Sequence, residues 1–340
     1  MRPFDAQARA QYTVVAAVTA LILYLHLTTV FCVRVAMPRW ILLLFNLGPV
    51  LVLVNYYLAC FTDPGSPSPN YEPPPQTTAL LIPIIDSTTD INSPSSSIHL
   101  TSSAYLQQQQ DPFNESSTAD RTTPFCHKCN AFKPPRTHHC SKSKRCILRM
   151  DHFCFLAGTC IGYANQAHFV RFLVWTTWAC WALVGVYILR LETVFSAMVY
   201  GRSDGIPVGD GEVVVIGMNL AILTPVVSMV SMLCWNQLDL LVCNKTTIES
   251  INAMPTRAYR YKSGNFDLRE NVWDLRSWIR NVEQVMGPKW SLWLVPDMRC
   301  VFHHGSLRKR NEDCVWLMEG HWFPISDELR ERLEGKLNAK

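Results

Sequence analysis

Charged side chains are scarce in this 340-residue sequence, at 17% of all residues, whereas hydrophobic residues make up 49%. The length would suit one or two soluble domains, but so low a charge with so many apolar residues argues against a soluble protein. A net charge of only +4 does not indicate nucleic-acid binding. The first apolar stretch is long and lacks a small-residue cleavage site, so we expect no signal peptide.

Four stretches lack Asp, Glu, Lys and Arg altogether, namely residues 10–33, 40–62, 172–189 and 213–238. Crossing a bilayer takes about 20 apolar residues. The stretches therefore predict four transmembrane helices at residues 10–33, 40–62, 171–191 and 213–238. A buried helix of a soluble protein is the alternative for any one of them, but four such lengths in one chain argue against it.

The charges beside these stretches predict their orientation. Residues 121–160 hold eight Lys or Arg and one acid, whereas residues 191–212 hold one Arg and four acids. Cytosolic loops are the ones enriched in Lys and Arg. We therefore expect the second loop, the tail at 242–340 and the N-terminus in the cytosol, although Arg34 and Arg39 in the first loop mildly oppose this.

The second loop has two unlike parts. Residues 64–123 are rich in Pro, Ser and Thr and predict a disordered cytosolic insertion. Residues 124–170 are dense in Cys and His and predict a compact module. In the tail, residues 281–296 carry Trp290 and Trp293 three positions apart, which indicates a short amphipathic element at the membrane surface or one that packs against the module.

Six of the 13 cysteines lie between Cys126 and Cys160. In a basic cytosolic loop they indicate metal binding or thiolate chemistry rather than disulfides. Cys126, Cys129, His139 and Cys146 have the spacing C-x2-C-x9-H-x6-C, and these ligand types suit tetrahedral zinc. A metal would also explain how so short and polar a segment folds.

The residues Asp151, His152 and Cys154 have the members of a nucleophile–base–orienter set. A nearby imidazole and the cations of Lys144, Arg145 and Arg149 would lower the pKa of the thiol. Taken alone, this short pattern leaves two readings open, catalysis or a further metal ligand.

The stretch "CHKCNAFKPPRTHHC…RCILRMDHFC" resembles the DHHC cysteine-rich domain of protein palmitoyltransferases over about residues 124–170. "DPG" at 63–65 and "TTIE" at 246–249 resemble further marks of that family. The resemblance implies an all-α integral membrane protein with four transmembrane helices and a small zinc-binding cytosolic module between helices 2 and 3.

The resemblance also implies residue roles. Cys154 matches the acylated nucleophile, His152 its base and Asp151 the group that orients the imidazole. The acyl chain would enter a cavity among the four helices. Three basic positions match residues that contact the phosphates of coenzyme A: Lys133, Arg136 and His138. Thr247 and Asn281 match polar residues that tie the tail to the site.

The departures from the family pattern concern a second zinc site. Family members usually hold a second zinc with residues at positions 140, 143, 153 and 160. Here Cys140 and Cys160 remain, but Ser143 and Phe153 are not suitable ligands. We expect one zinc and a degraded second site, with replacement ligands from His127 or His168 left open. The motif thus reads DHFC, a divergent form of the kind found among fungal enzymes.

The sequence therefore predicts a protein S-acyltransferase that moves palmitoyl from palmitoyl-CoA to cysteines of membrane-proximal proteins. The alternative is an inactive membrane scaffold that keeps the family fold. The expected partners are palmitoyl-CoA, membrane-associated proteins with cytosolic cysteines and the bilayer, without nucleic acid. The expected location is a multi-pass position in the endomembrane system, in the ER, Golgi, vacuole or plasma membrane.

Overall fold

The structure is a computed structural model that describes residues 3–33, 39–67, 71, 125–201, 211–251, 271 and 273–296. Side chains of residues 3–7, 32–33 and 39–44 are not described. The predicted insertion at 64–123 lies outside the described residues except for residues 64–67 and 71. The tail beyond residue 296 also lies outside them.

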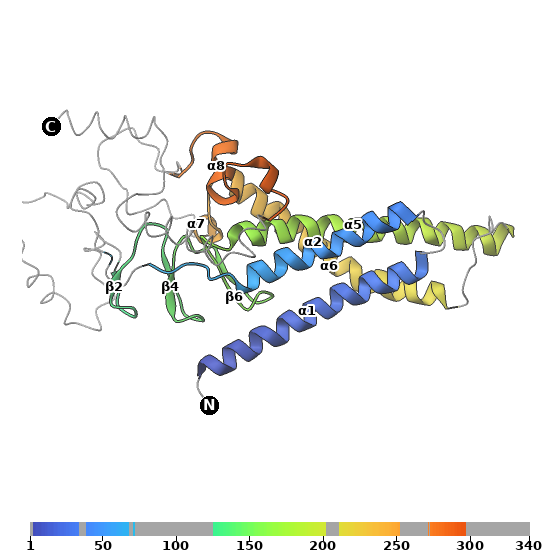
Figure 1. The fold of residues 1–340 in the computed structure, drawn as a ribbon, viewed down its shortest axis with the longest axis horizontal. Coiled ribbons are helices and arrows are strands. Elements are labelled where there is room, and N and C mark those ends of the chain that lie inside the picture. The colour runs from blue at the N-terminus through green and yellow to red at the C-terminus, as the bar shows by residue number, and fades with distance from the viewer. Residues whose placement is uncertain are drawn as a thin grey trace, which may run out of the picture.

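Four long helices lie side by side, with small β-hairpins gathered at one end of them (Figure 1). The helices are α1 (Pro3–Val33), α2 (Arg39–Phe61), α5 (Gln166–Tyr200) and α6 (Glu212–Val242). Each covers one of the four predicted apolar stretches. Three segments are long and apolar enough to cross a bilayer: Ala8–Phe31, Gln166–Tyr200 and Glu212–Val242. Within α2 the apolar segment described is the shorter Phe45–Phe61.

The third helix is longer than its uncharged stretch because a charge inside it is neutralised. Arg190 is buried in α5 and forms an ion pair with Glu212, the first residue of α6, including a contact of 2.8 Å between Nη2 and Oε2. A paired charge is tolerated where a lone one would be costly. The helix therefore continues to Tyr200 and stops at Gly201, whose φ of 63° is left-handed.

The cysteine-rich module consists of three two-stranded antiparallel hairpins, with no larger sheet among the described residues. Their strands are β1 (Phe125–Cys126) with β2 (Ala131–Phe132), β3 (His138–Cys140) with β4 (Arg145–Ile147), and β5 (His152–Cys154) with β6 (Thr159–Ile161). Strands this short cannot stabilise a fold by themselves. Contacts with the helices must therefore contribute to holding the module.

Side chains and backbone from both α2 and α5 tie the module to the helices. Asn165 precedes α5 and donates to Ala59 O in α2 and Cys160 O in β6, at 3.0 Å each. Gly65, after α2, accepts from the backbone N–H of Leu148 at 3.0 Å. A Cβ at Gly162 would meet Ile147 Cγ2 at 2.6 Å, so this position requires glycine.

The chain after α6 returns to the same end of the helices. It forms α7 (Thr247–Ile251), α8 (Trp278–Met286) and the 3-10 turn η2 (Trp290–Leu292). Apolar residues of α8 pack against α5 and α6, in a cluster that contains Val170, Leu241, Val282 and Met286. The amphipathic element expected at 281–296 thus packs on the two helices, with Trp290 left 79% exposed.

Polar residues inside the bundle pair with one another. His26 Nε2 lies 2.8 Å from Asn46 Oδ1, and Asn219 Nδ2 donates to Tyr187 Oη at 2.8 Å. Tyr187 also contacts Thr29. Such polar pairs between helices fit a structural role, since polar groups in apolar surroundings need partners.

Candidate functional site

Cys154 ends strand β5 at the point where the module meets the helices. Its side chain is only 9% exposed and belongs to an apolar cluster with Tyr56 of α2 and Phe172 of α5. The Tyr56 hydroxyl donates to Leu156 O at 2.6 Å, which fixes the turn after the cysteine. The thiol therefore sits between the cysteine-rich module and the apolar interior of the bundle.

His152 lies on the same strand, two residues before Cys154. Successive residues of a strand point to opposite faces, so these two side chains share a face. The Cys154 thiol is a hydrogen-bond neighbour of the imidazole, and Asp151 Oδ2 lies 2.7 Å from His152 Nδ1. Burial would lower the pKa of His152, but Asp151 and Cys154 outweigh it and raise that pKa to about 9. The carboxylate and the thiol thus both favour the protonated form of the imidazole.

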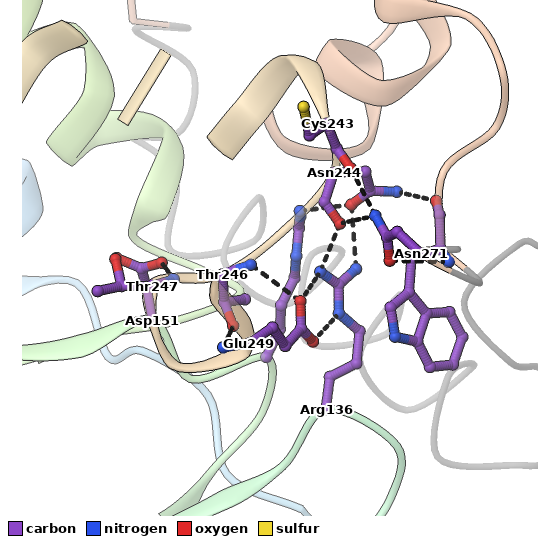
Figure 2. A network of polar contacts seen from close by, with 10 residues as sticks. Arg136, Asp151, Cys243, Asn244, Thr246, Thr247, Glu249 and Asn271 are labelled. Atoms are coloured by element: carbon purple, nitrogen blue, oxygen red, sulfur yellow. Dashed lines mark hydrogen bonds and ion pairs between the residues drawn. The ribbon is translucent and has the colours of Figure 1, made fainter. Parts of the chain in front are cut away.

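Asp151 is completely buried and receives hydrogen bonds from the chain beyond α6. The Thr247 backbone N–H donates to Oδ1 at 2.7 Å, and its hydroxyl lies 3.0 Å from Oδ2. Figure 2 shows Thr247 beside this carboxylate. Burial would raise the pKa of Asp151, but His152 and Thr247 lower it below its ordinary value. The carboxylate therefore stays ionised and orients the imidazole.

Gln237 of α6 is a further donor that the sequence did not single out. Its Nε2 donates to Asp151 Oδ2 at 3.0 Å and to Thr247 Oγ1 at 3.1 Å. The side chain is 5% exposed. An amide near the end of an otherwise apolar predicted helix was the only signal for it, and that signal does not say what the amide contacts.

A second polar cluster joins the module to the end of α6 (Figure 2). Arg136 pairs with both carboxylate oxygens of Glu249 at 2.8 Å each, and donates to Asn244 Oδ1 at 3.0 Å. Arg149 donates to the same Asn244 oxygen at 2.8 Å. Two guanidinium groups from the module thus share one amide oxygen from the turn that follows α6.

Two features of this cluster cost free energy: left-handed backbone at three non-glycine residues and the burial of a guanidinium group. Arg136, Arg149 and Asn244 have positive φ angles of 60°, 43° and 48°. The left-handed region costs a non-glycine residue about 1 kcal/mol or more. Burial, and then the charge of Arg136, lower the pKa of Arg149 to about 9. Glu249 offsets part of that cost with its negative charge. Although burial would raise the pKa of Glu249, Arg136 lowers that pKa below its ordinary value, which favours the charged carboxylate.

Four residues of the module are arranged as a metal site. Cys126, Cys129, His139 and Cys146 place their ligand atoms within 4.8 Å of one another. His139 Nδ1 lies 3.2 Å from Cys129 Sγ and 3.5 Å from Cys126 Sγ. His139 and Cys146 are direct cross-strand partners in the β3–β4 hairpin. Three sulfurs and one imidazole at these separations suit a tetrahedral zinc ion, whose bonds are about 2.0–2.3 Å long.

No second group of three or more Cys, His, Asp or Glu ligands occurs in the part of the chain that the structure describes. Cys140 and Cys160 are buried and lie beside Ser143, and Phe153 packs against them. His168 is buried in α5 and is not part of a ligand group with them. Positions 140, 143, 153 and 160 thus hold two thiols, a hydroxyl and a benzyl group.

The other predicted contact residues fall into two groups. Asn281 lies in α8 and ties the tail to α6, since its Nδ2 donates to Val242 O at 2.7 Å. Thr247 contacts Asp151 as described above. Lys133 and His138 are partly exposed on the module, whereas the Arg136 side chain is 1% exposed and engaged by Glu249. Arg136 is thus placed to connect the module with the tail.

A small apolar cavity of about 80 Å³ lies among α1, α2, α5 and α6. Its walls include Leu25, Val52, Trp178 and Val226. Val52 also belongs to the apolar cluster around Cys154. The cavity lining is almost wholly apolar, as an alkyl chain would require.

Residues 120–254 match the sequence model of the family described as DHHC palmitoyltransferase. The chain is 36% identical over 185 residues to a protein named palmitoyltransferase PFA3 of Yarrowia lipolytica, covering 51% of this chain and 45% of that protein. It is 29% identical over 260 residues to a probable protein S-acyltransferase 14 of Arabidopsis thaliana, covering 75% and 71% of the two chains.

Similarity extends to animal proteins. The chain is 30% identical over 226 residues to palmitoyltransferase ZDHHC15 of Rattus norvegicus, covering 64% of this chain and 61% of that one. Among these relatives the matched part thus spans from about half to about 70% of the relative's length. The family-model match at residues 120–254 includes the module and the segment after α6 that contacts Asp151.

Proposed function

We propose that this chain, whose residues 120–254 form a DHHC palmitoyltransferase domain, is a protein S-acyltransferase. It takes a palmitoyl group from palmitoyl-CoA onto Cys154 and passes it to a cysteine of a membrane-associated protein. The observation that carries this proposal is the contact set of Asp151, His152 and Cys154, at 2.7 Å between carboxylate and imidazole with the thiol beside the ring. A buried apolar cluster surrounds the thiol, where an acyl chain would lie.

The reaction has two steps. In the first, the Cys154 thiolate attacks the thioester carbon of palmitoyl-CoA, and the C–S bond to coenzyme A breaks as the new bond forms. The leaving CoA thiolate takes the proton from the His152 imidazolium. In the second, His152 removes the proton of the acceptor thiol, which attacks the acyl-enzyme and releases the Cys154 thiolate. Asp151 keeps the imidazole oriented in both steps.

Zinc would have a structural role. Cys126, Cys129, His139 and Cys146 would hold one ion and link the β1–β2 hairpin to the β3–β4 hairpin. A bound zinc ion supplies cross-links that a segment with such short strands cannot obtain from its own core. Cys154 is not among these ligands, so its sulfur remains available for acyl transfer.

The bilayer would surround four spans, with α2 as the fourth crossing helix beside α1, α5 and α6. The first residues of α1 and the helices α7 and α8 lie at the same end of the bundle as the module (Figure 1). With the basic module in the cytosol, both termini are cytosolic. An endomembrane compartment, such as the ER, Golgi, vacuole or plasma membrane, is the proposed location.

Polar contacts with coenzyme A are assigned to Lys133 and His138, which are partly exposed on the module. Arg136 belongs to the same proposed set, although Glu249 already engages its guanidinium. Thr247 and Asn281 would act indirectly by fixing the segment after α6. The acyl chain would occupy the cavity among the four helices, where each buried CH₂ gains about 0.8 kcal/mol.

Transfer between purified components tests the function. The full chain in lipid nanodiscs is incubated with alkynyl palmitoyl-CoA and a membrane-anchored peptide that bears one cysteine. The proposal expects label on the protein first and on the peptide afterwards. An inactive scaffold would give no label on either partner beyond the uncatalysed background.

A further inference from the structure

Two buried thiols from different hairpins meet beside Ser143. Cys140 in β3 is 3% exposed and Cys160 in β6 is 0% exposed. The Ser143 backbone N–H donates to Cys140 Sγ at 3.4 Å, and Ser143 Oγ lies 3.5 Å from Cys160 Sγ. The two thiols are also close enough that each affects the pKa of the other. One serine therefore holds two sulfurs that are 20 residues apart in the chain.

A metal ion does not account for this pair. The described residues contain no third Cys, His, Asp or Glu ligand atom grouped with the two sulfurs. Cys160 has Phe153 as its direct cross-strand partner, and the Phe153 ring packs against the cluster of Cys140, Met150 and Cys160. Structural zinc takes four ligands. An apolar ring thus occupies the space that further ligands would need.

Strand geometry keeps the pair separate from the candidate zinc site. His139 and Cys140 are adjacent in β3, so their side chains point to opposite faces of the hairpin. His139 faces the four-ligand cluster, and Cys140 faces Cys160. Zinc bound by His139 would therefore leave both Cys140 and Cys160 as free thiols.

We propose that Cys140 and Cys160 form a reversible disulfide when the protein meets hydrogen peroxide. One sulfur attacks the peroxide oxygen, which gives a sulfenic acid and one molecule of water. The second thiol attacks that sulfur, forms the S–S bond and releases a second molecule of water. Hydrogen peroxide is reduced, and the two thiols lose two electrons and two protons. A dithiol reverses the reaction by exchange.

The disulfide would connect two parts of the module with different tasks. Cys140 lies in the β3–β4 hairpin, which carries two of the zinc ligands, and Cys160 lies in β6, which pairs with the strand of Cys154. A covalent link closes the loop from 140 to 160 and restricts the unfolded module. Oxidation would therefore keep these hairpins together. This inference does not depend on acyl transfer.

The test uses the full chain in detergent, with and without hydrogen peroxide. The protein is then unfolded and alkylated, and its peptides are mapped without reduction. We expect a peptide linking Cys140 to Cys160 to rise about tenfold over untreated protein and to disappear with dithiothreitol. The same link is expected in Cys154→Ser, which removes the proposed acyl-carrying thiol.

A variant that restores ligands provides the matched control. Ser143→Cys with Phe153→His adds two ligand side chains to the two thiols, which makes four, and the variant should bind one more zinc per chain than the natural protein. Its link between Cys140 and Cys160 should then be lost at the same peroxide concentration. Full alkylation of Cys140 and Cys160 after peroxide would overturn the proposal, as would a zinc ion bound by this pair in the natural chain.

Discussion

Asp151 and Gln237 are joined by a hydrogen bond of 3.0 Å, although 86 residues separate them in the chain. The bond connects the start of strand β5 with the final turns of α6, and Gln237 extends it to the Thr247 hydroxyl. The orientation of the carboxylate that faces His152 thus depends on a membrane helix as well as on the module. Residues outside the cysteine-rich segment are therefore expected to control the reactivity of Cys154.

Replacing Gln237 tests this dependence. Gln237→Leu keeps the side-chain size but removes the donor to Asp151. A hydrogen bond to a charged group contributes about 1.5–3 kcal/mol, so autoacylation should slow by about tenfold or more. The rate is measured as single-turnover labelling by acyl-CoA. Gln237→Asn does not serve as a conservative control, because its shorter side chain would not reach Asp151. Thr247→Ser serves instead, since it retains the hydroxyl that contacts Asp151 and should keep most activity. Unchanged labelling in Gln237→Leu would contradict the role.

The stability of the site should depend on pH through His152. The pKa of His152 is raised from 6.5 to about 9, mainly by Asp151 and against the effect of burial. Because the folded-state pKa lies above the unfolded one, the stabilisation is complete below about pH 6.5 and is lost as pH rises through about 9. Asp151→Asn should therefore lower the melting temperature most at about pH 6 and least near pH 10. An equal loss at both pH values would contradict this assignment.

The buried ion pair between Arg136 and Glu249 should matter more than the exposed pair between Arg145 and Asp63. The pairs have equally short contacts of 2.8 and 2.9 Å, but the second has side chains 39% and 64% exposed. Glu249→Gln leaves Arg136 buried without its counter-ion and should cost about 3 kcal/mol of unfolding free energy. Asp63→Asn should cost less than about 1 kcal/mol. Denaturant unfolding of both variants measures the difference, and similar costs would refute the distinction.

Metal content tests the assignment of ligands. The purified chain should hold one zinc ion, and Cys129→Ser should lose it along with the fold of the module. Cys140→Ser should keep it, because Cys140 is not among the four grouped ligands. The measurement is elemental analysis alongside protein concentration. Two zinc ions per natural chain would contradict the view that the positions around Phe153 no longer bind metal.

The sequence predicted the positions of the long helices well, because an uncharged stretch of sufficient length has few alternatives. The uncharged stretch that predicted the third membrane helix ends at Arg190, whereas α5 continues beyond it. The structure shows that Arg190 finds a partner in Glu212, a contact across a loop that no local pattern encodes. The helix therefore runs on to Tyr200.

The candidate site was predictable in part. Spacing and resemblance brought together Asp151, His152 and Cys154, and the four grouped metal ligands, because each set is local in the chain. Gln237 was missed, since its importance comes only from packing of α6 against the module. The sharing of Asn244 by Arg136 and Arg149 was equally hidden, because it depends on left-handed backbone at three non-glycine residues.

The most direct test of the proposed chemistry is the site of the acyl-enzyme. The full chain is incubated with alkynyl palmitoyl-CoA, and its hydroxylamine-sensitive label is mapped by mass spectrometry. We predict label on Cys154, its loss in Cys154→Ser, and its retention in Cys243→Ser, which removes a partly exposed thiol at the end of α6. Full hydroxylamine-sensitive labelling of Cys154→Ser would contradict the account.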